Sequence, residues 1–312
     1  MVNTEIPVKR IAAIDIGSNA IRDSVAEITD DWDYKILYRN RIPLRLGDEA
    51  FSQGRISDYT IEKCLNTFWK LRQKFESYNV SMIRAVATSA LRNSENRKDF
   101  IKQIFDKTGI VIHIIDGFHE AKLIYQAVRS SMDLSRGKYL IMDLGGGSLE
   151  LTAVNEGRFV ECHTFKLGAL RLQHLQNESP LKKQEHIDQK RESIVKFLES
   201  SFGGKFDDVQ LIGTGGNPRR MGKLRKRFLE CATSELVHLD EMKYFHNELK
   251  DLSLLGRVKK FDLRMDRADV IYQALEVFIM MSEVVGTNKI DLPKVGLING
   301  IFEDVLHTEM NH

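Results

Sequence analysis

The sequence predicts an α/β protein with two similar halves that face each other across a cleft. Two stretches, 11–22 and 143–150, each place an aspartate at the end of a short apolar strand, before small turn residues and a second strand. Asp15 aligns with Asp143, and a glycine stands two residues after each. This repeat indicates an internal duplication. Apolar residues at 58–78 have helical spacing, so strands and helices are mixed along the chain.

Short apolar runs predict the strands, and helical apolar spacing predicts the helices. Strands are expected within 10–45 and at 82–87, 110–115, 138–142, 149–154, 159–165, 209–212 and 289–290. Helices are expected at 58–78, 97–107, 184–202 and 264–285, with another at the C-terminus. Asp23 falls on a predicted strand, where a carboxylate is costly unless it is exposed or paired. We therefore expect Asp23 to pair with a neighbouring arginine or to face solvent.

Composition limits the class of protein. The chain has 312 residues, of which 42% are hydrophobic and 29% are charged, so it can bury a substantial core and its length favours two domains. The formal net charge of +2 argues against a general DNA-binding surface. Cys64, Cys162 and Cys231 lack metal-ligand spacing and are too few for a disulfide framework. Without an apolar signal segment or a membrane-length run, a cytoplasmic protein with reduced thiols is expected.

The stretch from Asp143 to Glu150 has the chemistry of a phosphate and metal site. Three consecutive glycines permit positive φ and let an anion approach the backbone amides. Two carboxylates beside an anion require a cation between them, so Asp143 and Glu150 imply Mg²⁺ or a similar hard ion. The alternative is a tight hairpin with flanking acids that bind nothing.

The repeated hairpins resemble the phosphate loops of the actin-like superfamily, which includes sugar kinases and heat-shock chaperones. More narrowly, motifs from near residue 11 to near residue 300 resemble the exopolyphosphatase and guanosine pentaphosphate phosphohydrolase family. The resemblance implies two ribonuclease-H-like (actin-like) domains flanking an inter-domain cleft. Domain I would cover 1–126, with the C-terminal helix at about 301–312 packing back on it, and domain II would cover 127–300.

The resemblance also implies which residues bind substrate phosphate. They are Gly17, Ser18, Asn19, Arg22, Ser89, Arg92, Gly145, Gly146, Gly147, Ser148, Gly215 and Gly216. Arginine suits this task because its planar fork can hold two phosphate oxygens. The alternatives are a solvated edge residue for Arg22 and a surface residue at a helix start for Arg92.

Glu120 corresponds to the family's catalytic base, which activates water. It opens a helix after a predicted strand, where it could reach a water in line with the scissile bond. Alternatively, Glu120 only favours the dipole at the helix N-terminus. The resemblance therefore implies three catalytic residues, Glu120, Asp143 and Glu150, with Mg²⁺ held by Asp143 and Glu150.

The chain departs from the family pattern at Ala20, His119, Asn217, Ile298 and Asn299. These departures motivate a second hypothesis, a weak or inactive sensor that binds guanosine tetra- or pentaphosphate or polyphosphate without turnover. The retained Glu120, Asp143 and Glu150 favour a hydrolase. A sugar-kinase-like ATPase is a third hypothesis, which the segment around Arg92 fits less well.

The sequence leaves the substrate and the assembly open. Six cations between 219 and 227 form the densest basic run, which is either a solvated helix or part of a groove for a polyanion. Inorganic polyphosphate needs many cations and no base pocket, whereas guanosine pentaphosphate also needs a purine site, so the run slightly favours polyphosphate. No membrane partner is expected, and a homodimer is suggested only by analogy.

Overall fold

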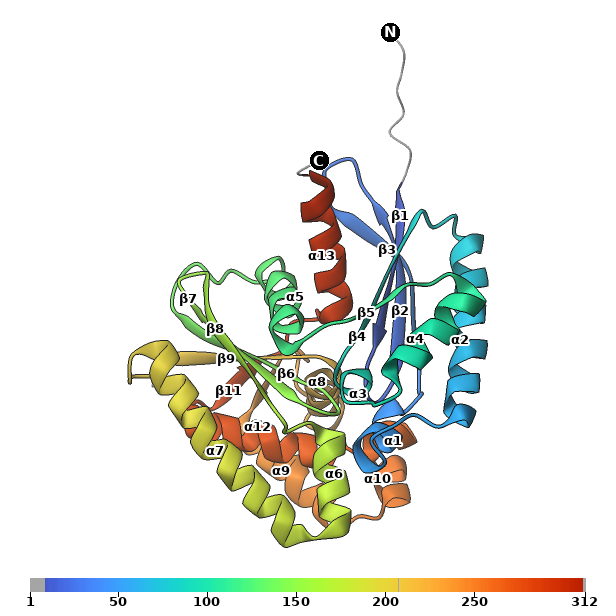
Figure 1. The fold of residues 1–312 in the computed structure, drawn as a ribbon. Coiled ribbons are helices and arrows are strands. Elements are labelled where there is room, and N and C mark those ends of the chain that lie inside the picture. The colour runs from blue at the N-terminus through green and yellow to red at the C-terminus, as the bar shows by residue number, and fades with distance from the viewer. Residues whose placement is uncertain (1–8, 207, 311–312) are drawn as a thin grey trace. The chain divides into compact units, whose positions relative to one another are not determined.

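The computed structural model describes residues 9–206 and 208–310 (Figure 1). The N-terminal stretch in which no signal segment was predicted lies outside them. Contacts between residues divide the chain into two compact units. Unit 1 contains the residues up to Asp116 and those from Ile298 onward, and unit 2 runs from Gly117 to Leu297. The domain limits at 126 and 300 stay a prediction.

Unit 1 is built on a five-stranded sheet in the order β3-β2-β1-β4-β5. The first three strands are antiparallel neighbours, whereas β4 and β5 extend the sheet in parallel with β1. The strands are β1 (Arg10–Ile16), β2 (Ile21–Ile28), β3 (Tyr34–Ile42), β4 (Met82–Ala87) and β5 (Ile112–Ile114).

Unit 2 repeats this plan with one additional edge strand, in the order β10-β11-β9-β6-β7-β8. The strands are β6 (Lys138–Leu144), β7 (Leu149–Asn155), β8 (Arg158–Phe165), β9 (Val209–Thr214), β10 (Leu236–His238) and β11 (Lys289–Asp291). Both units interrupt the pairing of their second and third strands at equivalent positions, Val25/Ala26 and Ala153/Val154. The predicted α/β fold with two similar halves is confirmed.

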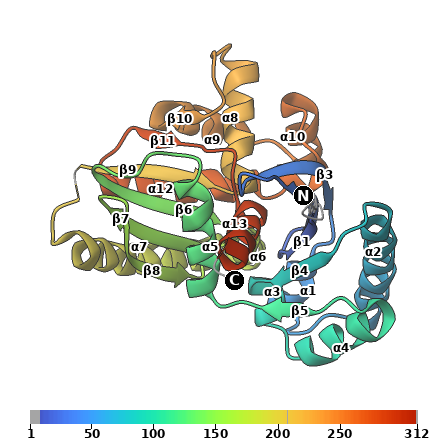
Figure 2. The ribbon, with the colours of Figure 1, turned by 90° about the horizontal axis from the view of Figure 1, so that it is seen from above.

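One face of the unit 1 sheet is covered by α2 and α4, which lie side by side (Figures 1 and 2). Ser57 caps the start of α2 by accepting a hydrogen bond from the Thr60 amide, and α2 buries an apolar stripe at helical spacing. The helices of this unit are α1 (Leu46–Ser52), α2 (Asp58–Ser77), α3 (Ser89–Arg92), α4 (Arg97–Thr108) and most of α13 (Leu297–Met310).

Helix α13 contacts strand β3 of unit 1. The Phe302 ring lies 5.1 Å from the Tyr34 ring, and the Asn299 amide donates to the Tyr34 hydroxyl at 3.0 Å. The helix expected at 301–312 therefore begins earlier, and its last two residues lie outside the described part of the chain.

In unit 2, α5 lies on one face of the sheet and α7 and α12 lie on the other (Figure 1). The helices are α5 (Gly117–Arg129), α6 (Ala169–Glu178), α7 (Pro180–Phe202), α8 (Gly216–Phe228), α9 (Leu239–Lys250), α10 (Leu254–Phe261), α11 (Met265–Ala268) and α12 (Ile271–Val285). The single helix expected at 264–285 was wrong. It divides because the amides of Arg267 and Val270 bond to carbonyls three residues earlier, which tightens the turn and ends α11. No helix of the described residues is long and apolar enough to cross a membrane.

Asp23 is a second correction, because it neither pairs with an arginine nor faces solvent. It is only 1% exposed, between the core residues Ile21 and Val25 on β2, and its cross-strand neighbour is Asn40. Burial raises the pKa of the Asp23 carboxyl to about 6, while the Asn40 amide lowers it by less. The alternation of β2 directs Asp23 into the core, where burial makes the carboxyl a weaker acid than it would be in water.

Candidate functional site

Four polar side chains form a row across the unit 2 sheet, next to the turn Gly145 to Ser148, here called the glycine loop. Thr164 on β8 pairs with Glu150 on β7. Glu150 pairs with Asp143 on β6, and Asp143 pairs with Thr214 on β9. Directly paired residues point to the same face of a sheet. The hairpin register therefore places two carboxylates side by side.

Helix α5 adds a third carboxylate to this face of the sheet. Gly117 begins the helix in such close contact with Thr164 that a Cβ at position 117 would overlap the threonine hydroxyl. The buried face of α5 includes Ala121 and Ile124, and Glu120 lies on that face with 6% of its surface exposed. The close approach at Gly117 thus anchors the turn that carries Glu120.

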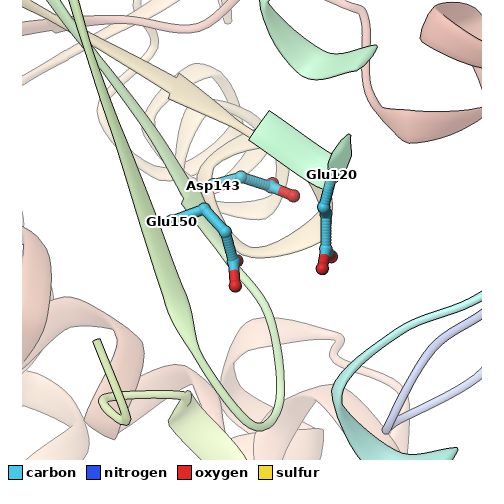
Figure 3. Close-up of side chains that lie close together, drawn as sticks. All are labelled: Glu120, Asp143 and Glu150. Carbon is cyan, nitrogen blue, oxygen red and sulfur yellow. The ribbon is translucent and has the colours of Figure 1, made fainter. Parts of the chain in front are cut away.

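The carboxylates of Glu120, Asp143 and Glu150 converge. One oxygen from each lies within 4.8 Å of the other two, and Figure 3 shows the three side chains coming from one helix and two adjacent strands. Glu150 is 2% exposed, and Asp143 is half-buried. Thr214 donates its hydroxyl proton to Asp143 Oδ1 at 3.0 Å, which fixes one oxygen of that carboxylate.

The chemistry of this donor set suits a hard divalent cation. Carboxylates packed this closely in a largely buried position repel one another strongly unless a proton or a cation lies among them. Carboxylate oxygens are the ligands that Mg²⁺, Mn²⁺ and Ca²⁺ prefer. The acidic cluster therefore fits the predicted metal ligands Asp143 and Glu150, with Glu120 as an adjacent acid.

Helix α6 fixes the carbonyl groups of the glycine loop. The backbone amides of residues 169–171 donate to the carbonyls of Gly145 and Gly146, each at 3.0 Å. The Arg171 side chain completes the set by donating from Nε to the Gly147 carbonyl at 2.9 Å. Three successive carbonyls of the loop thus bond to the start of α6.

This attachment determines where the loop amides point. The peptide bonds of the loop are trans, so each N–H points opposite to the carbonyl of the same peptide unit. The N–H groups of Gly146, Gly147 and Ser148 are consequently turned away from α6. Successive amides with a common direction form an anion-binding concavity. This orientation suits the phosphate contacts predicted for the loop.

The glycine loop packs closely against the start of α6, and its three glycines do not have unusual dihedral angles. The positive φ that the sequence suggested for them does not occur at Gly145, Gly146 or Gly147. The backbone of α6 instead approaches the loop so closely that a Cβ on Gly168 would overlap the backbone of Gly146 and Gly147. The expectation of positive φ is therefore wrong here, because the loop follows the surface of a helix.

The predicted loop residues Gly215 and Gly216 lie beside the acidic cluster. Gly215 has a φ of +90°, and a Cβ on it would come within 2.7 Å of Asp143 Oδ1. A Cβ on Gly216 would overlap the guanidinium of Arg267, which also donates to Asn217 Oδ1 at 3.3 Å. Asn217, a departure from the family pattern, thus contacts a buried arginine.

The first predicted phosphate loop, Gly17 to Ala20, belongs to unit 1. Ser18 and Asn19 are buried, and the Ser18 carbonyl accepts a bond from the Gly47 amide at the start of α1. Arg22 donates from Nη1 to Asp15 Oδ2 at 2.6 Å. The predicted anion clamp is therefore engaged with the aspartate of its own hairpin.

Ser89 and Arg92 occupy the short helix α3, directly after β4 in unit 1. Ser89 is buried and accepts hydrogen bonds from the Asn93 amide. Arg92 donates from Nη1 to the Ile115 carbonyl at 2.7 Å. Both residues thus lie directly after β4, the strand that pairs in parallel with β1.

Several residues of the unit 2 site were missed from the sequence. Thr214 bonds to Asp143, and Gly117 and Gly168 permit the close contacts of α5 and α6. The signal for Thr214 was present, because it directly precedes a predicted glycine loop. The close contacts of the two glycines involve partners distant in the chain, so local sequence carried no signal for them.

Comparison with known proteins identifies the family. The model of the Ppx/GppA phosphatase family matches residues 24–309, which is most of the chain. The chain belongs to the Ppx/GppA phosphatase family. The matched residues include the acidic cluster and the glycine loop, and the loop Gly17 to Ala20 precedes them.

Solved structures of the Ppx/GppA family share the fold. A family member from Aquifex aeolicus superposes with a TM-score of 0.78 at 23% identity, covering 98% of this chain and 100% of that one. An exopolyphosphatase from Cytophaga hutchinsonii superposes with a TM-score of 0.87 at 22% identity, covering 96% and 98%. These likenesses confirm the predicted actin-like type of both units.

Curated relatives are longer than this chain. A bifunctional 3-dehydroquinate synthase/phosphatase from Fusobacterium nucleatum is 28% identical over 248 residues, which are 74% of this chain and 36% of the relative. Exopolyphosphatase 1 from Mycobacterium tuberculosis is 29% identical over 163 residues, which are 52% of this chain and 47% of the relative. The match thus spans about half or less of these relatives.

Proposed function

We propose that the protein is a phosphohydrolase that removes the terminal phosphate of a phosphoanhydride chain. The observation that carries this proposal is the convergence of Glu120, Asp143 and Glu150 beside a loop with three similarly oriented amides. A cation site next to an anion-binding loop is the arrangement that phosphoryl transfer needs. Family membership and the name of the mycobacterial relative support the same reaction.

Each part of the site has a role in this reaction. The amides of Gly146, Gly147 and Ser148 would bind the terminal phosphate, and Glu120 would orient a water and accept its proton. The water oxygen bonds to phosphorus while the bridging oxygen leaves with the electron pair of the broken bond. A Mg²⁺ ion held by Asp143 and Glu150 would neutralise negative charge on the phosphate oxygens. The products are inorganic phosphate and a chain shorter by one phosphate.

The charge on α8 favours linear polyphosphate as the substrate class. Arg220, Lys223 and Arg227 follow Gly216 after four, seven and eleven residues, so they share one helix face. At 1.5 Å per residue, this basic stripe is about 10 Å long from Arg220 to Arg227, which suits a chain of several phosphates. Arg227 also contacts Asp262 at 2.5 Å, but both side chains are largely exposed, so this pair is weak.

The test is phosphate release by the purified protein from long-chain polyphosphate and, in parallel, from guanosine pentaphosphate, each with Mg²⁺ or with chelator. Glu120→Gln removes the proton acceptor and should slow release about 100-fold or more. Glu192→Gln, on the exposed part of α7, is the matched control and should behave like the wild type. Release that requires metal and Glu120 supports the proposal.

No release from either substrate, together with equal ligand binding by wild type and Glu120→Gln, would overturn the enzymatic proposal. The predicted sensor of polyphosphate or guanosine tetra- or pentaphosphate would then remain. Phosphorylation of a sugar by ATP would instead identify the kinase-like alternative.

A further inference from the structure

Arg171 lies in the first turn of α6, and the proposed reaction does not use it. Its guanidinium lies half-buried against the glycine loop and donates to the Gly147 carbonyl at 2.9 Å. Burial lowers the pKa of this arginine. Burying part of a cation costs free energy unless hydrogen bonds compensate for the lost water, and the bond to the Gly147 carbonyl is one such bond. The carbonyl it contacts lies between two of the amides assigned to phosphate binding.

The loop requires such an external restraint. Three successive glycines lose more backbone entropy on ordering than any other residues would. The amides of α6 hold the carbonyls of Gly145 and Gly146, which orients the N–H groups of Gly146 and Gly147. The N–H of Ser148 shares its peptide unit with the Gly147 carbonyl, and that carbonyl is held by the Arg171 side chain. The backbone of α6 thus holds two of the three loop carbonyls, and the Arg171 side chain holds the third.

We propose that Arg171 is a positioning residue, which holds the Gly147 carbonyl so that the Ser148 amide faces the terminal phosphate of the substrate. This inference rests on the proposed function of the same site. Arg171 donates to the rear of the loop, and its effect reaches the substrate through the peptide unit between Gly147 and Ser148. Loss of the guanidinium frees that peptide unit to rotate, so the loop presents two oriented amides where it presented three.

The test compares Arg171→Met with wild type and with Arg257→Met. Arg257 is the matched control because it is another half-buried arginine of unit 2 whose pKa burial lowers and whose Nε donates to a backbone carbonyl, that of Leu249, at 3.2 Å. Hydrogen–deuterium exchange is followed in the peptide that contains residues 143–150, and affinity for inorganic phosphate is titrated by ³¹P NMR. Neither readout requires turnover.

For Arg171→Met we expect at least tenfold faster exchange in that peptide and about tenfold weaker phosphate binding, which corresponds to about 1.4 kcal/mol. Arg257→Met should leave both quantities within twofold of wild type. Addition of methylguanidinium to Arg171→Ala should restore part of the phosphate affinity, whereas methylammonium should not. If Arg171→Met does not fold, Arg171→Lys, which keeps the charge without the Nε donor geometry, serves in the same comparison.

The inference is overturned if Arg171→Met and Arg171→Lys keep wild-type exchange and phosphate affinity, or if Arg257→Met changes them equally. These results are distinct from failure of the proposed function, which is the absence of phosphate release by the wild type. If the wild type binds phosphate but does not release it from polyphosphate, hydrogen–deuterium exchange and phosphate affinity still test the role of Arg171.

Discussion

Hairpins β1–β2 and β6–β7 share a backbone plan and differ in charge at one cross-strand pair. In the first, Asp15 lies opposite Arg22, and the two form an ion pair at 2.6 Å. In the second, Asp143 lies opposite Glu150, and both join Glu120 in the acidic cluster. The first hairpin neutralises its own carboxylate, whereas the second concentrates negative charge. The matched position opposite the aspartate therefore determines the difference. Arg22 gives an ion pair in the first hairpin, and Glu150 gives a candidate cation site in the second.

The two loops also differ in how firmly they are held. In unit 1, the Gly47 amide at the start of α1 bonds to the Ser18 carbonyl. In unit 2, the start of α6 bonds to three successive carbonyls, with Arg171 supplying the last bond. More fixed carbonyls mean more fixed amides on the opposite side of the loop. The hairpin with the acidic cluster is thus the one with the better oriented donors.

The interiors differ at a third matched position. Asp23 on β2 corresponds to Leu151 on β7, and both side chains are buried. A buried carboxyl is costly in its charged form, so unit 1 carries a pH-sensitive group at a position where unit 2 has an apolar side chain. The shared strand plan therefore accommodates a buried acid, Asp23, in unit 1 and a buried leucine, Leu151, at the same position in unit 2.

The largest expected effect comes from removing the acid that distinguishes the second hairpin. Glu150→Gln preserves the shape of the side chain while deleting one of three converging charges. Phosphate release should fall by about 1,000-fold, since electrostatic groups at a reacting centre have effects of this order. Steady-state phosphate assays measure it, with circular dichroism as the folding control. Activity within tenfold of wild type would show that the acidic cluster is not the reaction centre.

Gly168→Ala tests whether close packing of α6 orients the glycine loop. Its added methyl group would overlap the backbone of Gly146 and Gly147, so the loop must move. We expect about 100-fold weaker phosphate binding, within the range of overpacking costs. Gly222→Ala is the matched control, because its methyl group would overlap the Ser234 backbone in another part of unit 2. Equal losses of phosphate affinity in the two variants would argue against a specific role for α6.

Asp23→Asn tests the buried acid of unit 1. The folded protein binds the Asp23 proton up to about pH 6, whereas the unfolded chain releases it near 3.8. Stability from this group is therefore present below pH 3.8 and is lost as the pH rises through about 6. Near pH 4 the variant and wild type should be similar, and at pH 7.5 the variant should be more stable by about 3 kcal/mol.

Thermal unfolding across this pH range measures the difference, and Asp31→Asn, at an exposed turn, serves as the control. A variant that is no more stable than wild type at pH 7.5 would show that Asp23 is accommodated as a carboxylate.

Arg22→Gln should have the smallest effect. It removes the cation from the buried Asp15 and should lower the free energy of unfolding by about 1 kcal/mol, because the arginine is one-third exposed and the pair is partly screened. The double variant Asp15→Asn/Arg22→Gln should recover most of this loss, as measured by thermal unfolding. Unchanged stability with a raised KM for polyphosphate would instead support the role of Arg22 as an anion clamp.

Sequence alone predicted the parts of the site that depend on local pattern. Asp143 and Glu150 were predictable as neighbours because they flank a short turn between two strands, whose antiparallel pairing places them opposite each other. The position of Glu120 at a helix start was equally local. Its proximity to the other two acids depends on the contact between Gly117 and Thr164, which are distant in the chain.

The remaining features required the three-dimensional structure. Arg22 was predicted to face an anion, and its neighbour across the hairpin proved to be Asp15. Asp23 was expected to be paired with an arginine or exposed, but its strand directs the side chain into the core. Arg171 was not singled out from the sequence, because its bond to the Gly147 carbonyl depends on the path of α6 over the glycine loop.

The most direct test of the account is a Mn²⁺ titration followed by electron paramagnetic resonance, with wild type, Glu150→Gln and Asp15→Asn. The comparison of the hairpins predicts that wild type and Asp15→Asn bind Mn²⁺ with the same affinity, and that Glu150→Gln binds it at least about tenfold more weakly. Equal affinity in wild type and Glu150→Gln, or loss of binding in Asp15→Asn alone, would contradict the assignment of the cation site to the second hairpin.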